Sequence, residues 1–402
     1  MRLFYAEISD SSLHFSEQTT NKYTIIPRSD IYLSLGSNLG NRFEHLQKAI
    51  DSLFEEVGGI RKISAVYETP ALGFEGDPFL NCAVWMQTVL EPEAVLAKIL
   101  QIEKRMGRDR KATEGYSSRP IDIDILLIEE EVITSKTLTV PHPEIQNRKF
   151  VLQPLAELDS QLKHPVFQKK IVKLLAETAD TSVLEKQGKW LRNPNRDYDL
   201  GKLSYVAIEG NIGAGKTSLA TQISNDFNAK LILERFKDNP FLPKFYEDPE
   251  RYSFPLEMSF LADRYQQLLD DIKQFDLFQE VVVADYDAYK SLIFAKVTLA
   301  EEEYELYKKL FHLMHKELPK PDVYVYLYQN TERLLENIKK RGREYEQSIE
   351  AEYLQKINQG YLEFIKNQHN HTIKIIDISE LDFVENRKDY LKVLKQILNS
   401  EQ

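Results

Sequence analysis

Hydrophobic residues form two kinds of pattern along the chain, and the two patterns alternate. Short runs rich in β-branched and aromatic residues predict strands, whereas longer segments with apolar residues at every third or fourth position predict helices. In the first half, strands are expected over residues 31–37, 60–72, 78–90 and 120–130, and helices over residues 43–57 and 93–106. Strands that share one sheet with two helices predict an α+β sandwich of about 140 residues.

The second half has a different order of elements. Strands are expected over residues 205–208, 230–236, 280–287, 321–329 and 373–379, with the clearest helices between them at residues 253–275 and 301–316. Five short apolar strands joined by helices predict a parallel sheet that is covered on both faces. The fold class expected for the chain is therefore two domains, an α+β sandwich followed by an α/β domain with a five-stranded parallel sheet.

A polar stretch separates the two patterns. Residues 171–187 have amphipathic helical spacing, and residues 188–202 have the composition of a loop. We expect one domain over residues 29–165, a helical linker over residues 166–202 and a second domain over residues 203–402. Residues 1–28 form an N-terminal arm to which the sequence assigns no chemistry.

Composition narrows the class of protein. The 402 residues are 42% apolar and 29% charged, as is ordinary for a globular protein, and the net charge of −11 argues against a nucleic-acid polymer as partner. The single cysteine, Cys82, excludes an internal disulfide and is expected to be a buried, inert thiol. We find no apolar run of membrane-spanning length and no signal peptide, so the expected location is the cytoplasm, with no membrane partner.

The clearest chemical motif lies at mid-chain, directly after the strand at residues 205–208. The spacing Gly210-x4-Gly215-Lys216-Thr217 is that of a phosphate-binding loop, in which backbone N–H groups and the N-terminus of the next helix surround phosphate oxygens. Lys216 is expected to reach the β- and γ-phosphates, and Thr217 to bind Mg²⁺. The expected ATP-binding residues here are Gly210, Asn211, Ile212, Gly213, Ala214, Gly215, Lys216, Thr217 and Ser218.

The first half carries a different candidate site in the strand PIDIDILLI. Residues two apart in a strand point to the same side, so Asp122 and Asp124 should project together on the face opposite the isoleucines. Adjacent carboxylates suit a hard cation, and Mg²⁺ is the natural choice beside phosphates. The basic residues nearby, which could hold triphosphate oxygens, are Arg108, Arg110, Lys111 and Arg119. Taken alone, the pair fits an exposed edge strand beside a charged loop better than a metal site.

Five motifs in this half resemble, in order, those of the 6-hydroxymethyl-7,8-dihydropterin pyrophosphokinases of folate synthesis. They are LSLGSNLGNR, YETPALG, FLNCAV, RPIDIDILL and VPHPEIQNRKFVLQPL, and they cover about residues 30 to 160. The resemblance implies a ferredoxin-like fold, two Mg²⁺ ions and pyrophosphoryl transfer from ATP to the pterin. It assigns the metals to Asp122 and Asp124, the phosphates to Arg108 and Arg119, the ATP site to Glu103, Arg110 and His142, and the pterin to Thr69, Pro70, Leu72, Phe79, Asn81 and Phe150.

The second half resembles the deoxyribonucleoside kinases. The motifs that carry the resemblance are IEGNIGAGKTSL, ERFKDNPFLPKFY, YEDPERYSFPLEMSFLADRY, SLIFAK and KKRGREYEQSI, which again follow the family order. The resemblance implies transfer of the γ-phosphate of Mg·ATP to the 5′-hydroxyl of a deoxynucleoside by a homodimer that associates through this domain. It assigns the general base to Glu234, lid charges to Arg341 and Arg343, and the deoxynucleoside and its 5′-hydroxyl to Tyr246, Glu257, Arg264, Asp285 and Glu346.

Two positions depart from the deoxyribonucleoside kinase pattern. The usual Glu-Arg-Ser after the third strand is replaced by Asp285, Tyr286 and Asp287, so the arginine's role is vacant or is filled from elsewhere. The usual base-reading glutamine is replaced by Glu257. A carboxylate only accepts hydrogen bonds, which suits the N1–H and N2–H₂ donors of guanine, whereas a protonated carboxyl would leave deoxyadenosine open. We therefore expect a purine deoxynucleoside, with a preference for deoxyguanosine.

The sequence leaves one alternative function open. Both halves are expected to be ATP-dependent kinases, so that the chain is a bifunctional transferase. In the alternative, one half alone is catalytic and the other is a regulatory or dimerisation module.

Overall fold

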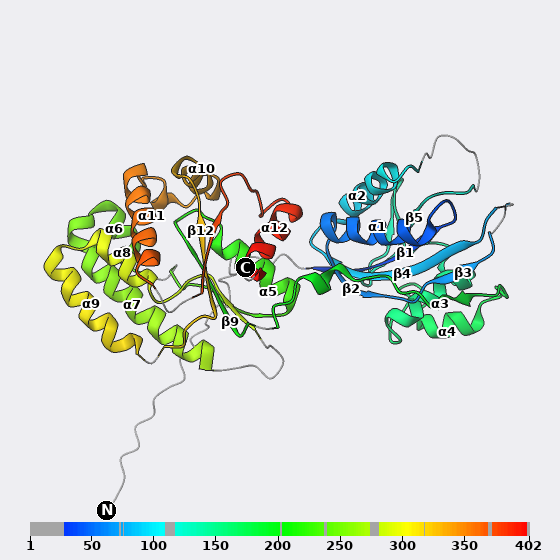
Figure 1. Cartoon of the computed structure of the whole chain (residues 1–402), viewed down its shortest axis with the longest axis horizontal. Coiled ribbons are helices and arrows are strands. Elements are labelled where there is room, and N and C mark those ends of the chain that lie inside the picture. Colours follow the sequence, from blue (N-terminus) through cyan, green and yellow to red (C-terminus); the bar gives the residue numbers. More distant parts are fainter. Residues whose placement is uncertain are drawn as a thin grey trace, which may run out of the picture.

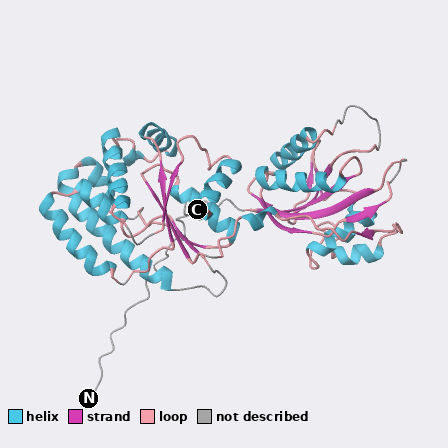
Figure 2. Ribbon diagram, viewed as in Figure 1, coloured by secondary structure: helices cyan, strands magenta, loops and turns pink. Residues whose placement is uncertain are grey.

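The computed structural model describes residues 28–71, 74, 76–108, 117–201, 203–236, 239–273, 281–316, 318–368 and 372–399. Two lobes lie side by side along the long axis of the molecule, one for each half of the chain (Figure 1). Each lobe has one main sheet with helices against it, as Figure 2 shows. The expected division into two domains is therefore visible in the arrangement of the elements.

The sheet of the first lobe is antiparallel and has the order β5-β1-β4-β3-β8, with β2 also paired to β4. The four expected strands are present, but the second is divided into β2 and β3. The strands are β1 (Ser29–Ser37), β2 (Gly59–Ile63), β3 (Tyr67–Thr69), β4 (Phe79–Thr88), β5 (Asp122–Ile128) and β8 (Glu185–Lys186), and β6 (Ile133–Thr134) pairs separately with β7 (Thr139–Val140).

Helices cover both faces of this first sheet. The alternation of β1 sends Ile31, Leu33 and Leu35 into the core beneath α1 (Arg42–Glu56) and α2 (Pro92–Arg105). Tyr32 points the other way, into a second core with α3 (Lys149–Leu158) and α4 (Ile171–Glu177). The two predicted helices are confirmed, and α3, which the sequence pattern did not predict, forms a third layer together with α4. A short 3₁₀ helix, η1 (Ile145–Asn147), precedes α3.

The segment between the lobes is less helical than the sequence pattern predicts. The helix expected over residues 171–187 ends at Glu177, and β8 then pairs with β3 in the first sheet. Asp180 accounts for the early end, because its side chain accepts hydrogen bonds from the backbone N–H groups of Ser182 (2.8 Å) and Lys149 (2.8 Å). Such local side-chain bonds compete with helical ones. A short 3₁₀ helix, η2 (Pro194–Asp197), follows.

The sheet of the second lobe is parallel and has the order β10-β11-β9-β12-β13, which confirms the predicted five-stranded sheet. Its strands are β9 (Tyr205–Gly210), β10 (Lys230–Ile232), β11 (Val282–Ala284), β12 (Val323–Tyr328) and β13 (Ile373–Asp377). The helices are α5 (Lys216–Phe227), α6 (Leu242–Glu247), α7 (Pro249–Lys273), α8 (Lys290–Thr298), α9 (Glu301–His315), α10 (Thr331–Arg341), η3 (Glu344–Glu346), α11 (Ala351–Lys366) and α12 (Arg387–Leu398).

Helices lie on both faces of the parallel sheet, as predicted. Val206 and Ile208 of β9 pack with residues of α5 and α12, on the face nearer the first lobe. Tyr205 and Ala207 point to the opposite face, where α7 and α9 lie (Figure 1). Because the strands are buried on both faces, their residues are apolar in continuous runs rather than in alternation.

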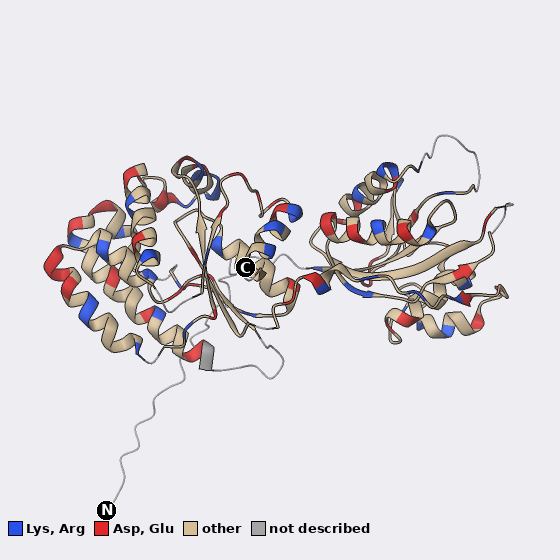
Figure 3. Cartoon of the chain, in the orientation of Figure 1, with Lys and Arg blue, Asp and Glu red and all other residues tan. Residues whose placement is uncertain are grey.

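The two lobes meet where α12 lies against α1. Arg387 donates a hydrogen bond from Nε to the carbonyl oxygen of Phe54 (2.8 Å) and forms an ion pair with Asp226 of α5 (3.3 Å). Lys388 forms an ion pair with Glu56 (3.2 Å). Acidic and basic side chains are otherwise interspersed over the helices of both lobes (Figure 3). Within the described ranges, none of the helices combines the length and apolar character needed to cross a bilayer.

Candidate active sites

The aspartate site of the first lobe stands at the start of β5. Ile123 and Ile125 are buried in the core, whereas Asp122 and Asp124 are half-buried on the other side of the strand. The alternation predicted from PIDIDILLI is therefore present. Gly36 and Ser34 of β1 lie opposite these aspartates in the antiparallel register.

Two arginines and a buried glutamate surround Asp122. Arg119 reaches Oδ2 of Asp122 at 2.9 Å, and Arg108 forms ion pairs with both Asp122 and Glu103. Glu103 is 1% exposed and also accepts a hydrogen bond from the backbone N–H of Ile123 (2.9 Å). Glu103 of α2 thus fixes the start of β5 and the arginine beside it. The structure brings together four of the residues predicted for phosphate and metal binding.

Asp124 differs from Asp122 in its electrostatic environment. Burial, together with the neighbouring Asp122 carboxylate, raises the pKa of Asp124 to about 7. The oxygen donors of the two aspartates suit a divalent hard cation, which would favour the ionised form of Asp124.

Polar and aromatic side chains lie beside the aspartates. Asn81 donates a hydrogen bond to Thr69 Oγ1 (2.8 Å), and a Cβ added at Gly36 would come within 3.0 Å of Asn81 Oδ1. The guanidinium of Arg119 lies 5.6 Å from the centre of the Phe79 ring. These contacts join the predicted pterin-binding residues Thr69, Phe79 and Asn81 to the predicted phosphate-binding arginine.

The remaining residues predicted for this site are less closely joined to it. The ring of Phe150 is half-buried and lies 5.9 Å from the guanidinium of Arg148. Burial, reinforced by Arg148, lowers the pKa of His142, whose Nδ1 accepts a hydrogen bond from the Glu144 backbone (3.2 Å). Pro70 is exposed. The predictions for Leu72 and Arg110, and the basic residue Lys111, fall outside the described residues.

Asn38 is a site residue that sequence reasoning missed. Its side chain donates to Ser118 Oγ (3.1 Å) and to the Asp77 carbonyl (3.1 Å), and it accepts from the backbone N–H of Arg119 (2.8 Å). Asn38 therefore holds the segment before Asp122 against the end of β1. The position of Asn38 in the sequence could have indicated this role, because a buried polar residue that directly follows a buried strand needs hydrogen-bond partners.

The phosphate-binding loop of the second lobe connects β9 to α5. Gly215 has φ +84°, a left-handed conformation that favours glycine, and Ser218 lies in the first turn of α5. The Lys216 ammonium folds back onto the loop and donates to the carbonyl oxygens of Gly210 and Asn211, both at 2.9 Å. Burial, with Lys290 nearby, lowers the pKa of Lys216 to about 8. The order of strand, glycine-rich loop and helix is the one predicted from the motif, whereas the contact of Lys216 with phosphates stays a prediction.

The same loop is tied to its surroundings through asparagines. Asn211 donates from Nδ2 to the Leu354 carbonyl (2.7 Å) and to Asn358 Oδ1 (2.8 Å), both on α11. Asn337 of α10 donates to the Gly213 carbonyl (2.9 Å). Ile212 and Ala214 fill the loop between these anchors, and Ala214 is buried. The loop is therefore held in place before any ligand binds.

Asp285 links the phosphate-binding loop to the predicted general base. Its Oδ2 accepts a hydrogen bond from Thr217 Oγ1 (2.5 Å), and its Oδ1 accepts one from the backbone N–H of Glu234 (2.7 Å). Asp285 stands after β11 and Glu234 stands after β10, so both lie at the carboxyl edge of the sheet, beside the loop. Parallel α/β sheets bind their ligands at this edge.

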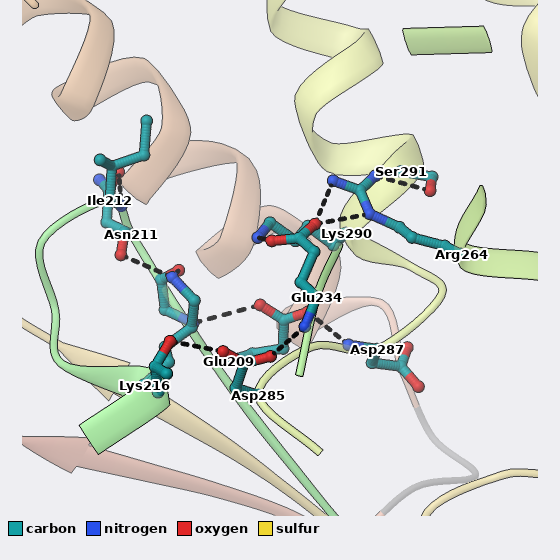
Figure 4. A network of polar contacts seen from close by, with 12 residues as sticks. Glu209, Asn211, Ile212, Lys216, Glu234, Arg264, Asp285, Asp287, Lys290 and Ser291 are labelled. Carbon is teal, nitrogen blue, oxygen red and sulfur yellow. Dashed lines mark hydrogen bonds and ion pairs between the residues drawn. The ribbon is translucent and has the colours of Figure 1, made fainter. Parts of the chain in front are cut away.

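Two cations flank the carboxylate of Glu234 (Figure 4). Arg264 of α7 reaches Oε1 with Nη2 (2.7 Å) and Nε (2.8 Å), and Lys290 of α8 reaches Oε2 (2.5 Å). Burial alone would raise the pKa of Glu234, but Lys290 and Arg264 hold it at about 2. Lys290, only 6% exposed, was not among the predicted site residues. The sequence feature that could have identified Lys290 is the position of a lysine in the otherwise mostly apolar run AYKSLIF.

Glu209 is a second residue that the sequence reasoning missed. Its carboxylate is fully buried, with Oε1 accepting from the Asp287 backbone (2.7 Å) and Oε2 accepting from the Tyr361 hydroxyl (2.7 Å). Burial raises the pKa of Glu209, and Lys290 and Lys216 oppose the shift. Glu209 thereby holds the segment after β11 against β9 and α11. A carboxylate inside an otherwise apolar strand was the sign that it needed dedicated partners.

Glu257 lies deeper in the second lobe, on α7. Oε1 accepts a hydrogen bond from Thr298 Oγ1 (3.1 Å), whereas Oε2 is buried without a hydrogen-bond partner among the described residues. Burial raises the pKa of Glu257 to about 7, although Arg264 and Thr298 oppose the shift. A buried carboxyl oxygen without a partner is costly unless a ligand supplies one.

The predicted lid residues form a separate group around Glu346. Arg341 and Arg343 both form ion pairs with this carboxylate, the second at 3.0 Å. Arg343 also lies 4.3 Å from the centre of the Phe236 ring. Tyr246 stacks on Tyr345 with ring centres 5.9 Å apart. Arg341, Arg343, Glu346 and Tyr246 are thus brought together, at the end of α10 and beside α6.

The donor atoms of both sites suit Mg²⁺. The hydroxyl of Thr217 beside the carboxylate of Asp285 offers hard oxygen ligands, as does the Asp122–Asp124 pair. No group of three or more His, Cys, Asp or Glu side chains in the described part of the chain is arranged to hold a metal ion.

Comparison with known proteins gives a different match for each lobe. Residues 32–160 match the family described as 7,8-dihydro-6-hydroxymethylpterin-pyrophosphokinase, and residues 206–400 match the family described as deoxynucleoside kinase. The first match includes 2-amino-4-hydroxy-6-hydroxymethyldihydropteridine pyrophosphokinase of Aquifex aeolicus, 45% identical over 35% of this chain and 87% of that protein.

For the second lobe, deoxyguanosine kinase of Bacillus subtilis is 41% identical over 48% of this chain and 95% of that protein. A solved structure of deoxyadenosine kinase from M. mycoides is 28% identical and covers 47% of this chain and 96% of that one, with a TM-score of 0.42.

Proposed function

Because the chain belongs to the 7,8-dihydro-6-hydroxymethylpterin-pyrophosphokinase family in its first half and to the deoxynucleoside kinase family in its second, we propose that its two sites work as independent ATP-dependent transferases. One transfers a pyrophosphoryl group to 6-hydroxymethyl-7,8-dihydropterin, and the other phosphorylates a deoxynucleoside. The proposal rests on one observation. Each lobe has a network of ion pairs, one around Asp122 and one around Glu234.

In the first lobe, the hydroxymethyl oxygen of the pterin forms a bond to the β-phosphorus of ATP, and AMP leaves. Arg108 and Arg119 already lie beside Asp122 and can exchange that carboxylate for phosphate oxygens. Phe79, beside Arg119, is proposed to stack on the pterin, and Asn81, beside Thr69, to hydrogen-bond it. Mg²⁺ bound by Asp122 and Asp124 would neutralise triphosphate charge. The strand order of this lobe supports our proposal of a ferredoxin-like fold.

In the second lobe, the 5′-oxygen of the nucleoside forms a bond to the γ-phosphorus of ATP, and ADP leaves. Glu234 accepts the hydroxyl proton, and the phosphate-binding loop with Lys216 holds the β- and γ-phosphates. Arg341 and Arg343 add positive charge from the end of α10, while Tyr246 and Glu346 are proposed to bind the 3′-hydroxyl. Mg²⁺ on Thr217 and Asp285 would neutralise developing charge.

Glu257 supports a purine substrate with a preference for deoxyguanosine. Its unpartnered Oε2 is a buried acceptor, and guanine offers two adjacent donors at N1 and N2. The similarity to a deoxyguanosine kinase agrees with this choice. We expect the largest kcat/KM for deoxyguanosine in a panel of the four natural deoxynucleosides. A comparable kcat/KM for deoxycytidine or thymidine would refute the proposal.

The two activities can be tested independently in the intact chain. Asp122→Ala should abolish pyrophosphoryl transfer to the pterin and leave deoxynucleoside phosphorylation unchanged, and Lys216→Ala should have the reverse effect. Each variant is the folding control for the other. If wild-type protein lacks one activity while the other persists, the silent lobe is a regulatory or dimerisation module instead.

We also propose a homodimer that forms through the second lobe. The outer surface of α9 exposes Leu306 (51%) and Leu313 (69%), which are seven residues apart and so share one side of the helix. Light scattering should give twice the chain mass for wild-type protein and a monomer for the Leu306→Glu, Leu313→Glu variant. Val183→Glu, at an exposed valine of the first lobe, is the matched control.

Three further assignments remain proposals. They are the domain limits 29–165 and 203–402, the linker 166–202, which contributes β8 to the first sheet, and a cytoplasmic location.

A further inference from the structure

The carboxylate of Glu234 is held by two cations that differ in how firmly they are fixed. Arg264 binds Glu234 through two nitrogens, donates from Nη1 to Ser291 Oγ (2.9 Å) and lies 4.7 Å from the centre of the Phe260 ring. These contacts fix the guanidinium plane in one orientation. Arg264 therefore suffices to orient the general base and to neutralise its charge.

Lys290 is fixed much less firmly. Its Nζ forms an ion pair with Glu234 Oε2 (2.5 Å) and lies 5.4 Å from the Phe294 ring centre. An ammonium group on a flexible four-carbon stem can move between neighbouring anions without a change in the backbone. Lys290 also opposes the rise that burial gives to the pKa of Glu209, so its ammonium group lies among several carboxylates rather than beside one fixed partner.

The phosphate-binding loop lies on the far side of Asp285 from Glu234. Asp285 contacts both Thr217 of that loop and the backbone of Glu234, so one side chain separates the base from the loop. In Figure 4, Lys216, Asp285, Glu234 and Lys290 form one continuous group. The charge of Lys290 also contributes to the lowered pKa of Lys216.

We propose that Lys290 is a phosphate-contacting residue of the second site: when Mg·ATP binds, its ammonium group moves from Glu234 Oε2 to the oxygens of the γ-phosphoryl group. The movement would free Oε2 for the nucleoside and would place positive charge on the group that is transferred. The 5′-oxygen then bonds to the γ-phosphorus, the bond to the β,γ-bridging oxygen breaks with its electron pair left on ADP, and the proton passes to Glu234. This inference rests on the proposed deoxynucleoside kinase activity.

The proposal explains how the chain functions without an arginine after β11. Asp285, Tyr286 and Asp287 follow that strand, and Tyr286 is fully buried in the apolar core with α7 and α9. The required cation comes instead from the first residue of α8.

The experiment compares four full-length proteins: wild type, Lys290→Gln, Lys290→Arg and Lys296→Met. The glutamine keeps a hydrogen-bond donor for Glu234 but carries no charge, whereas arginine restores the charge. Lys296 lies on the same helix with a half-exposed side chain paired to Glu363, so Lys296→Met is the matched control. Thermal unfolding and the pterin activity of the first lobe show that each variant is folded.

We expect Lys290→Gln to lower kcat for deoxyguanosine by about 10² to 10³, as the loss of one transition-state donor does, with little change in KM. Binding of ADP alone should change less than about twofold, whereas binding of ADP with aluminium fluoride and deoxyguanosine should weaken by about the same factor as kcat. Lys290→Arg should regain part of kcat, and Lys296→Met should match wild type.

Three results would overturn the inference. The first is wild-type kcat in Lys290→Gln, and the second is equal weakening of ADP alone and of the aluminium fluoride complex, because both indicate a purely structural ion pair. The third is a wild-type protein that phosphorylates no deoxynucleoside, which would remove the proposed function as well. The first two leave the proposed function intact.

Discussion

At the scale of single residues, we predict that Glu257 connects protonation to substrate choice. Its pKa is raised to about 7 by burial, so both protonation states are populated near neutral pH. The protonated carboxyl donates and accepts, which suits N1 and N6 of adenine, whereas the carboxylate only accepts, which suits N1–H and N2–H₂ of guanine. The charged form increases as the pH rises, so the preference should move toward deoxyguanosine in that direction.

We predict that the ratio of kcat/KM for deoxyguanosine to kcat/KM for deoxyadenosine rises between about pH 6 and about pH 8, by up to about tenfold per pH unit. Steady-state kinetics at each pH gives this ratio, in which effects common to both substrates cancel. Glu257→Gln should favour deoxyadenosine and give a flat ratio. A ratio that rises equally in both proteins would assign the pH dependence to another group.

Asn38 provides a second prediction at this scale, for the first site. Asn38→Ala removes three hydrogen bonds that hold Arg119 beside Asp122, so kcat/KM for the pterin should fall by about tenfold or more while deoxynucleoside phosphorylation is unchanged. Asn41→Ala in the same turn is the control. It removes a helix N-cap worth about 1 kcal/mol of stability and should leave the pterin kinetics intact.

At the scale of elements, two glycines with similar backbone conformation should respond differently to substitution. Gly215 begins α5 with φ +84°, and an added Cβ would come within 2.7 Å of the Phe383 ring. Gly342 ends α10 with φ +70° and has nothing within 4 Å of such a Cβ. Gly342→Ala should therefore cost only the left-handed strain, about 1–2 kcal/mol.

Gly215→Ala should cost about 2–4 kcal/mol, because overpacking adds to the same strain, and it should weaken ATP binding by about tenfold or more. Urea unfolding and a nucleotide titration measure the two effects. If both variants lose the same free energy of unfolding, the Phe383 ring moves away from the added Cβ at no cost in stability, which would contradict the prediction.

The elements also show how far the sequence determines the fold. The strands around Asp122 and Gly210 were predictable because their hydrophobic patterns are regular and their motifs are local. Strand β8 was not, because Glu185 and Lys186 have no strand-like composition and pair with β3 only through the tertiary fold. Lys290 was missed for a related reason: its partner, Glu234, is 56 residues away in sequence, and no local pattern joins them.

At the scale of the whole molecule, Asp226 joins the two lobes electrostatically. Burial raises its pKa, but Arg387 and Arg28 outweigh that effect and hold the pKa below its usual value. Arg387 also donates to the Phe54 carbonyl of the first lobe, so one side chain neutralises a buried charge in one lobe and contacts the backbone of the other.

We predict that Arg387→Ala lowers the free energy of unfolding by about 2–3 kcal/mol, less than the loss of an isolated buried pair because Arg28 remains. Lys388→Ala, at a half-exposed side chain of the same interface, should cost at most about 1 kcal/mol. Chemical unfolding measures both. Each variant should keep both enzyme activities, because neither residue lies in a site; loss of an activity in Arg387→Ala would show that the lobes depend on each other for function.

Strand β8 limits where the two enzymes can be cut apart. A gene divided near codon 165 would leave β8 on the kinase fragment and expose the free backbone of β3 at the rim of the first sheet, where other chains could add to it. A division near codon 201 would keep that edge covered. Recombinant halves split at the earlier point should therefore precipitate, even though each would retain every residue assigned here to its chemistry.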